Sequence, residues 1–239
     1  MSAFIFDVDG TLSETEEMHR AAFNAAFAEA NLPWHWDTDR YRELLKVSGG
    51  KERLRTFVEE GEIVSDMPFD ALIPALHQAK TRHYVEAVAG GQTALRPGVL
   101  DLVMEARRRG IRLAIATTTS RENVDGLLAT AFGDADLFEV IACGDMVAEK
   151  KPAPDIYDLA LERLGLPAEA CLAFEDSSNG LRAAKAAGLR CVVTPARYTL
   201  DEDFTGADLV LPDLRHAGPV WKLFGAGDGK QPPGLPLSP

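Results

Sequence analysis

Two aspartates close to the amino terminus follow directly after a short apolar run. Residues 3–6 are Ala-Phe-Ile-Phe, Asp7 and Asp9 come next, and Gly10 interrupts regular structure. An apolar run of this length that ends at a glycine is typical of a buried strand. Because side chains alternate along a strand, both carboxylates face the same side. One could attack phosphorus while the other transfers a proton. The alternative is an ordinary strand end with solvated aspartates.

A run of hydroxyl side chains follows a second apolar segment. Thr117, Thr118, Thr119 and Ser120 come after the apolar residues 112–116 and open a helical pattern. Hydroxyls and the amides at a helix start both bind phosphate oxygens. The alternative is simple helix capping by Thr119 or Ser120. The residues alone leave both interpretations open.

Two more carboxylates and a lysine pair complete the set of candidate site residues. Glu175 and Asp176 end another apolar run, and together with the first two aspartates they offer only oxygen ligands. Such a set favours Mg²⁺ over zinc, although Asp176 could instead cap the next helix. Lys150 and Lys151 precede Pro152. A solvated basic turn is the alternative here, but clustered carboxylates need a nearby cation, which favours a site.

The elements that must position these residues form an alternating pattern. Apolar strand candidates alternate with amphipathic helices from residue 96 onward. The predicted strands are 112–117, 138–142, 171–174, 191–193 and 208–211, and the predicted helices are 98–109, 121–131, 154–164 and 178–187. This alternation predicts an α/β fold with a Rossmann-like, mostly parallel sheet that includes the first strand. In such sheets, ligands bind beyond the carboxyl ends of the strands.

A block of helices interrupts the pattern after the first strand. Helical segments are expected at 15–31, 38–46, 50–60 and 69–89, with no strand-like alternation between them. They predict an all-helical cap domain at 15–89, inserted into a discontinuous core domain of 1–14 and 90–215. The remaining residues, 216–239, include a stretch rich in Gly and Pro and are expected to be a flexible tail.

Composition limits the partners of the chain. Its 239 residues are 46% hydrophobic and carry a formal net charge of −12. An acidic chain is a poor nucleic-acid binder, so no nucleic-acid partner is expected. The absence of a basic leader and of a long apolar run argues against secretion and a membrane partner. Three cysteines, an odd number in apolar surroundings, suggest buried thiols in a reducing compartment, so we expect a cytoplasmic protein.

Taken together, the motifs resemble those of the haloacid dehalogenase superfamily of phosphatases. The resemblance covers about residues 1–212. It includes DVDGT at 7–11, the strand that ends in Thr117, Lys151 within KKPAPDIY, and EDSSNG at 175–180. Each motif is weak alone, but four in order at predicted strand ends or loops form a specific pattern.

The resemblance implies a role for each motif residue. Asp7 would be the nucleophile that forms an aspartyl-phosphate, and Asp9 would be the general acid and base. Thr117 and Lys151 would contact the phosphate. Mg²⁺ would be held by Asp7, by the main-chain carbonyl of Asp9 and by Asp176, with Glu175 nearby or acting through water.

The helical insertion resembles the caps of β-phosphoglucomutase and of sugar-phosphate phosphatases, which close over the site. Substrate contacts are therefore expected from cap residues, including Glu17, Arg42 and Lys80. Gly49 and Gly50, followed by Lys51 and Arg53, could hold a second phosphate. The alternative is a glycine-rich turn with a solvated basic face. His19 fits an ordinary helix residue as well as a contact, and Trp34 and Trp36 are expected to pack the cap.

A closer resemblance is to the CbbY-type proteins of the Calvin-cycle operons. The matching stretches are FDVDGTLSETEEMHRAAFN, SGGKER, ATTTS, GDMVAEKKPAPDIY and EDSSNGLRAAKAAGLRC. That family is associated with dephosphorylation of xylulose-1,5-bisphosphate, a Rubisco inhibitor. The resemblance implies that Asp7 attacks the 1-phosphate, that Glu17 contacts sugar hydroxyls, and that Arg42, Lys51 and Arg53 are candidates for the 5-phosphate.

Three other functions remain as alternatives. One is a phosphosugar mutase like β-phosphoglucomutase, in which a sugar hydroxyl rather than water accepts the phosphoryl group. Another is a phosphatase with broader specificity for sugar phosphates or phosphoglycolate. The third, a non-enzymatic binder of a phosphometabolite, ranks last because Asp7, Asp9, Lys151 and Asp176 are all present. We expect a monomer with a phosphosugar substrate.

Overall fold

The computed structural model describes residues 2–61, 67–91, 93–133 and 135–225. Most of the predicted tail, residues 226–239, lies outside these ranges. The elements are β1 (Ala3–Phe6), α1 (Glu16–Glu29), α2 (Thr38–Leu44), α3 (Gly50–Glu60), α4 (Phe69–Ala89), α5 (Val99–Arg108), β2 (Arg112–Ala116), α6 (Arg121–Ala131), η1 (Ala135–Leu137), β3 (Val140–Ala142), η2 (Gly144–Met146), α7 (Asp155–Leu164), η3 (Ala168–Ala170), β4 (Cys171–Glu175), α8 (Ser178–Ala186), β5 (Arg190–Val193), β6 (Leu209–Val210) and α9 (Gly218–Gly225).

The strands form one parallel sheet in the order β3-β2-β1-β4-β5-β6. β1 lies between β2 and β4, with Phe6 in register with Ile115 on one side and with Phe174 on the other. The strand order reverses at β1, and such a reversal opens a crevice at the carboxyl ends of the strands. The predicted α/β class and parallel core are confirmed. The two carboxylate-bearing strands, β1 and β4, are direct neighbours.

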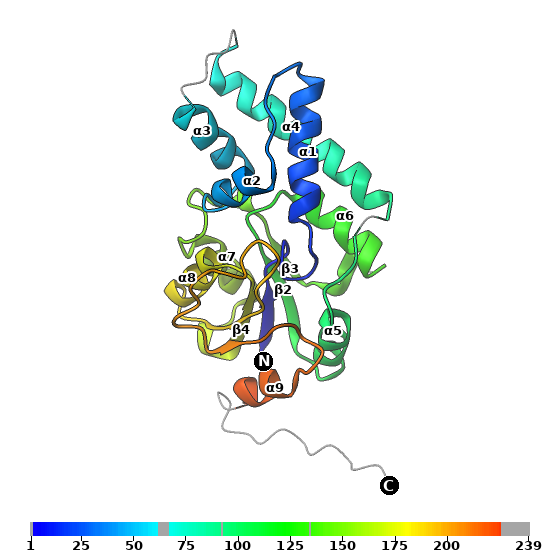
Figure 1. Cartoon of the computed structure of the whole chain (residues 1–239). Coiled ribbons are helices and arrows are strands. Elements are labelled where there is room, and N and C mark those ends of the chain that lie inside the picture. Colours follow the sequence, from blue (N-terminus) through cyan, green and yellow to red (C-terminus); the bar gives the residue numbers. More distant parts are fainter. Residues whose placement is uncertain (1, 62–66, 92, 134, 226–239) are drawn as a thin grey trace.

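Helices cover both faces of the sheet (Figure 1). The alternation along β1 directs Phe4 and Phe6 into one apolar cluster, which contains residues of α5, α6 and α9. It directs Ala3 and Ile5 into the opposite cluster, which contains residues of α7 and α8. Both clusters are built from buried side chains. Because β1 is buried on both faces, its sequence is a continuous apolar run rather than an alternation of apolar and polar residues.

Helices α1 to α4 form the helical cap above the carboxyl ends of the strands (Figure 1). An aromatic cluster that includes Phe23, Phe27, Trp36 and Tyr41 fills its interior, and Trp34 packs against that cluster as predicted. The two segments that connect cap and core run side by side, since Ser13 pairs with Leu95 in an antiparallel bridge. The exact limits of the cap, 15–89, stay a prediction.

Three cysteines lie in the core of the molecule. Cys143, Cys171 and Cys191 are all buried. Burial raises the pKa of the Cys143 and Cys171 thiols to about 11 and raises that of Cys191 as well. At neutral pH these residues therefore stay protonated and poorly nucleophilic.

Long apolar helices of the kind that cross a bilayer do not occur among the described helices.

The prediction of a flexible tail from residue 216 onward is wrong for α9. Val220 is fully buried, Phe224 is 8% exposed, and the Phe224 ring lies 4.8 Å from that of Phe4 in an edge arrangement. The Gly/Pro-rich composition that follows concealed a short amphipathic helix. Its apolar side chains cover the sheet face formed by Phe4 and its neighbours, and this tertiary contact stabilises a segment with little intrinsic helix propensity.

Removal of the Phe224 ring tests this packing. Phe224→Ala should lower the free energy of unfolding by about 3 kcal/mol, because a buried aromatic side chain is replaced by a cavity. Urea denaturation measures the change. Lys222→Ala on the exposed side of α9 is the control and should change stability little. Equal stability of the two variants would show that α9 does not contribute to the core.

Candidate active site

One pocket lies between the carboxyl ends of the central strands and the cap. Residues predicted from the strand ends and loops line its floor: Asp7, Asp9, Thr117, Thr118, Thr119, Lys151, Glu175 and Asp176. Residues predicted from the cap line its other side: Gly49, Gly50, Arg53 and Lys80. The structure thus brings together side chains that are far apart in the sequence, some of them by about three quarters of the length of the chain.

Lys151 is the buried cation of the pocket floor. Its Nζ donates to Asp7 Oδ1 at 2.7 Å, to Glu175 Oε1 at 2.6 Å and to the Ala116 carbonyl at 3.0 Å. Burial alone would lower the pKa of the Lys151 ammonium, but the charges of Asp7 and Glu175 raise it above its usual value. Tyr157 also donates to Glu175 Oε1, at 2.6 Å. The lysine therefore stays charged at neutral pH.

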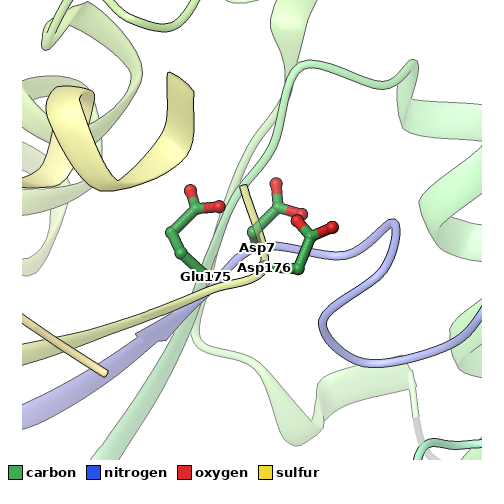
Figure 2. Close-up of side chains that lie close together, drawn as sticks. All are labelled: Asp7, Glu175 and Asp176. Atoms are coloured by element: carbon green, nitrogen blue, oxygen red, sulfur yellow. The ribbon is translucent and has the colours of Figure 1, made fainter. Parts of the chain in front are cut away.

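Three carboxylates meet beside this lysine. Asp7, Glu175 and Asp176 are buried, and each offers an oxygen within 4.8 Å of the others (Figure 2). Burial raises the pKa of Asp7 to about 8, against the opposing charge of Lys151. Burial, followed by the charges of Asp7 and Glu175, also raises the pKa of Asp176. A divalent cation would relieve this repulsion, and an all-oxygen set suits Mg²⁺.

The packing around the cluster leaves room for these carboxylates. Glu175 Oε2 is buried and has no hydrogen-bond partner among the described residues. A Cβ on Gly180 would overlap the Glu175 carboxylate, so glycine is required at the first turn of α8. The residues present therefore fit a metal ion held by Asp7 and Asp176. Glu175, already bound by Lys151 and Tyr157, would lie close to it.

Asp9 is held from the cap side of the pocket. Its Oδ1 accepts from Thr15 Oγ1 at 2.6 Å and lies 2.9 Å from His19 Nε2. Because a carboxylate only accepts, the imidazole must donate from Nε2. Burial would raise the pKa of Asp9, but His19 and Thr15 hold it well below its usual value. The His19 ring stacks on Tyr84 with centroids 4.1 Å apart.

The contact between His19 and Asp9 was not predicted. The available signal was the spacing of Thr15 and His19, which lie four residues apart directly after the Asp9 loop. Residues with this spacing share a helix face, so both could have been assigned to the side of α1 that faces the loop.

Of the four hydroxyl residues 117–120, the three threonines differ from Ser120 in their position relative to the pocket. Thr117 is buried and its Oγ1 accepts from the Thr119 amide at 3.3 Å. The Thr119 hydroxyl accepts from the Asn123 amide group at 2.8 Å. Ser120 takes the N-cap position of α6 but makes no capping bond, and it is not among the residues that line the pocket. The first three hydroxyl residues thus lie at the pocket, and the substrate role predicted for Ser120 has no support from this geometry.

On the cap side, Lys80 and Arg53 differ in how they are held. Lys80 is buried over the rings of Phe23 and Tyr84, 5.3 and 5.2 Å from their centroids. Burial lowers the pKa of its ammonium to about 8. Arg53, in contrast, donates to three groups of the cap: the Leu44 carbonyl, the Tyr41 hydroxyl and the Val47 carbonyl. Lys80 is therefore the more available cation.

Three substrate residues predicted from the cap are not among those that line the pocket. Glu17 accepts from the Tyr198 hydroxyl at 2.8 Å. The Arg42 guanidinium lies 5.9 Å from the centroid of that same tyrosine ring. Lys51 Nζ donates to Asp145 at 3.0 Å. Direct substrate contacts from these three residues remain predictions.

Several residues that were not predicted line the pocket, among them Glu16, His77, Asn179 and Tyr198. His77 precedes Lys80 by one helical turn, so the shared face of α4 was a usable signal. Burial lowers the pKa of His77 to about 3, which keeps its imidazole neutral. Asn179 and Tyr198 come from the core and lacked any local signal for contact with the cap.

Comparison with known proteins agrees with this geometry. Residues 1–188 match the family model described as haloacid dehalogenase-like hydrolase. The chain is 56% identical to Protein CbbY of Rhodobacter capsulatus over 219 residues, which cover 91% of this chain and 95% of that protein.

Solved structures of related proteins also resemble this chain. The crystal structure of a mutant CbbY from Rhodobacter sphaeroides in complex with xylulose-(1,5)bisphosphate matches with a TM-score of 0.86 and 52% identity, covering 91% of this chain and 97% of that one. A β-phosphoglucomutase from Clostridium difficile matches with a TM-score of 0.78 at 20% identity, covering 96% and 100%. The latter similarity concerns the fold alone.

Metal binding can be measured apart from catalysis. Mg²⁺ at about a hundred times its Kd should stabilise the protein by about 2.7 kcal/mol, because it binds the folded carboxylate cluster. Asp176→Asn should lose most of this stabilisation. Thermal unfolding with and without Mg²⁺ measures both, and Asp101→Asn on the exposed face of α5 is the control. An undiminished Mg²⁺ effect in Asp176→Asn would exclude a metal site at this cluster.

Proposed function

The chain belongs to the haloacid dehalogenase-like hydrolases and, within them, to the CbbY group of phosphatases, and from this we propose that it is a Mg²⁺-dependent enzyme that hydrolyses the 1-phosphate of xylulose-1,5-bisphosphate through an aspartyl-phosphate. One observation carries the proposal. Asp7, Lys151 and the threonine hydroxyl run meet at the floor of a pocket that the cap covers. A nucleophile, a fixed cation and hydroxyl donors at one point are what phosphoryl transfer requires.

In the proposed reaction, Asp7 attacks phosphorus and the bond from phosphorus to the sugar oxygen breaks. Lys151, fixed on Asp7 Oδ1, leaves Oδ2 for the attack and offsets the negative charge of both reactants. Thr117, Thr118 and Thr119 bind the phosphoryl oxygens. Bound Mg²⁺ would add neutralisation of charge between the carboxylates and the phosphoryl group.

Asp9 moves the protons in this scheme. His19 and Thr15 keep it ionised in the free enzyme, so the negative phosphate of the bound substrate has to raise its pKa and let it take up a proton. The protonated Asp9 gives this proton to the leaving sugar oxygen, and the resulting carboxylate then takes a proton from the water that hydrolyses the aspartyl-phosphate. Thr15 and His19 both bind Oδ1, so Oδ2 remains for proton transfer. Because these two residues belong to the segment that leads into the cap and to α1, the orientation of Asp9 depends on the position of the cap.

The cap side of the pocket supports a substrate with a second anionic group. Lys80 is a buried ammonium there, and the start of α3 at Gly49 and Gly50 presents backbone amides with the positive end of the helix dipole. The xylulose-bisphosphate complex of the Rhodobacter sphaeroides relative supports the same substrate class. We also propose that the enzyme acts as a cytoplasmic monomer in a Calvin-cycle context, as the sequence predicts.

The first test is phosphate release with Mg²⁺ from a substrate panel. The panel contains xylulose-1,5-bisphosphate, ribulose-1,5-bisphosphate, phosphoglycolate, and glucose and fructose phosphates. Xylulose-1,5-bisphosphate should be preferred, and Asp7→Asn should lower its turnover about a thousandfold or more, because the nucleophile is lost. Asp101→Asn serves again as the control.

Three results would overturn parts of this proposal. Even, weak activity across the panel would favour a broader phosphatase. Conversion of glucose 1-phosphate to glucose 6-phosphate would favour the mutase. Retained activity of Asp7→Asn would exclude the aspartyl-phosphate.

The charge of Lys80 predicts a pH dependence. Its pKa of about 8 means that the ammonium loses its charge as the pH rises from 7 to 9. If Lys80 binds the distal phosphate, kcat/KM for the bisphosphate should fall about tenfold over this range. Lys80→Met should start lower and lose this fall, whereas the surface control Lys222→Met should keep it. The same fall in Lys80→Met would assign the titration to another group.

A further inference from the structure

Residues 46–52 comprise most of the connection from α2 to α3 and the start of α3, and this segment lies at the pocket and against the core. Its residues Gly49 and Gly50 line the pocket, and α3 begins there. Within the cap, Arg53 donates to the Val47 carbonyl, and a Cβ on Gly50 would overlap the His77 ring. The inner side of the segment is therefore closely packed. The contacts on the outer side of the segment are made by residues of the core.

Two core residues form hydrogen bonds with the segment on either side of its glycines, and Nζ of a third, Lys150, lies 4.0 Å from Glu52 Oε1. Asn179 Nδ2 donates to the Lys46 carbonyl at 3.0 Å and lies 3.3 Å from Ser48 Oγ. Lys51 Nζ donates to Asp145 Oδ1 at 3.0 Å. The two contacts connect positions 133 and 94 residues apart in sequence. Together they span the stretch that presents the α3 amides to the pocket.

Both core partners are connected to the catalytic loops. Asn179 lies three residues after Asp176, in the first turn of α8. Asp145 lies in η2, and the carbonyls of Gly144 and Val147 on either side of it accept from Lys150 Nζ at 2.6 and 2.9 Å. Lys150 directly precedes Lys151. The outer contacts of the segment thus depend on the same loops that hold the metal carboxylate and the catalytic lysine.

We propose that Lys51, Asp145 and Asn179 form a clasp that positions the start of α3 over the pocket, and that Lys51 is a positioning residue rather than a ligand of the distal phosphate. The Lys51 ammonium is engaged by a carboxylate, and Lys51 is not among the residues that line the pocket. The clasp deepens the proposed function, on which it rests, because it sets specificity for substrates long enough to reach α3. Substrates with a single phosphate gain little from it.

The expected effect is modest. The Lys51 and Asp145 side chains are 44% and 60% exposed, and exposed ion pairs contribute little. Breaking the pair should raise KM for xylulose-1,5-bisphosphate about two- to fivefold, with kcat nearly unchanged. p-Nitrophenyl phosphate, which has no second phosphate, should show little change. Asn179→Ala should raise the same KM about two- to tenfold, since it removes the hydrogen bonds to the Lys46 carbonyl and the Ser48 hydroxyl.

A charge exchange separates the clasp from direct phosphate binding. Lys51→Asp and Asp145→Lys should each raise KM for the bisphosphate, and the double variant should return it to within about twofold of the wild-type value. If Lys51 contacts the phosphate, the double variant should remain impaired, because Asp at position 51 repels the phosphate. Persistent impairment would overturn the proposal. Arg55→Asp, the same charge change on the outer face of α3, is the control.

Hydrogen exchange measures the clasp without turnover. The amides of residues 46–54 should exchange faster in Lys51→Asp and in Asn179→Ala than in the wild type, and should recover in the charge-exchanged double variant. Unchanged exchange in both single variants would overturn the clasp. If exchange follows the clasp while the wild-type protein releases no phosphate from the bisphosphate, the proposed substrate is wrong and the clasp stands.

Discussion

Lys151 carries a buried positive charge that three segments of the chain share. Its ammonium binds Asp7 at the end of β1, Glu175 at the end of β4 and the last carbonyl of β2. A buried charge without partners is strongly unfavourable, and so is a buried carboxylate cluster without a cation. Each group therefore depends on the others, and their meeting point is the floor of the pocket. Asp176 adds a further carboxyl group there, whose pKa burial and the neighbouring carboxylates raise, and a divalent cation would stabilise its charged form.

The sheet makes this meeting possible. Parallel strands place their carboxyl ends at one edge, and the reversal of strand order at β1 leaves a crevice between β1 and β4. Phe6 and Phe174 stack below the carboxylates with ring centroids 4.4 Å apart, so the strand ends rest on a closely packed core. Because Gly180 has no side chain, α8 can lie close to Glu175 at the end of β4, and this close packing completes the floor of the pocket. The site is thus built on rigid elements, which suits a reaction that depends on alignment.

The cap is stabilised by its own aromatic interior, yet it contacts the core at functional groups. His19 and Thr15 bind Asp9, Tyr198 binds Glu17, and Asn179 binds the segment that opens α3. These contacts couple the orientation of Asp9, the aspartate proposed to transfer protons, to the position of the cap. They also explain why residues predicted as substrate ligands, such as Lys51, pair with protein groups instead. In a chain with a net charge of −12, a cationic side chain between cap and core can find a carboxylate partner in the protein itself, as Lys51 does in Asp145.

Local patterns in the sequence determined the alternation of helices and strands, the helical insertion and the floor of the site. Asp7, Thr117, Glu175 and Asp176 could be assigned to one place because the carboxyl ends of parallel strands always meet at one edge. The end of the chain was misjudged, since α9 depends on burial of Phe224 against Phe4, a contact that composition does not encode.

Only the tertiary structure decided which cap residues reach the site. The partners of Asp9, of Lys51 and of Asn179 depend on how the cap is oriented over the sheet, and that orientation results from many weak contacts between distant segments. Periodicity shows which face of a helix is buried but not which distant side chain it meets. For this reason the chemistry of the floor follows from the sequence, whereas the contacts between cap and core follow from the fold.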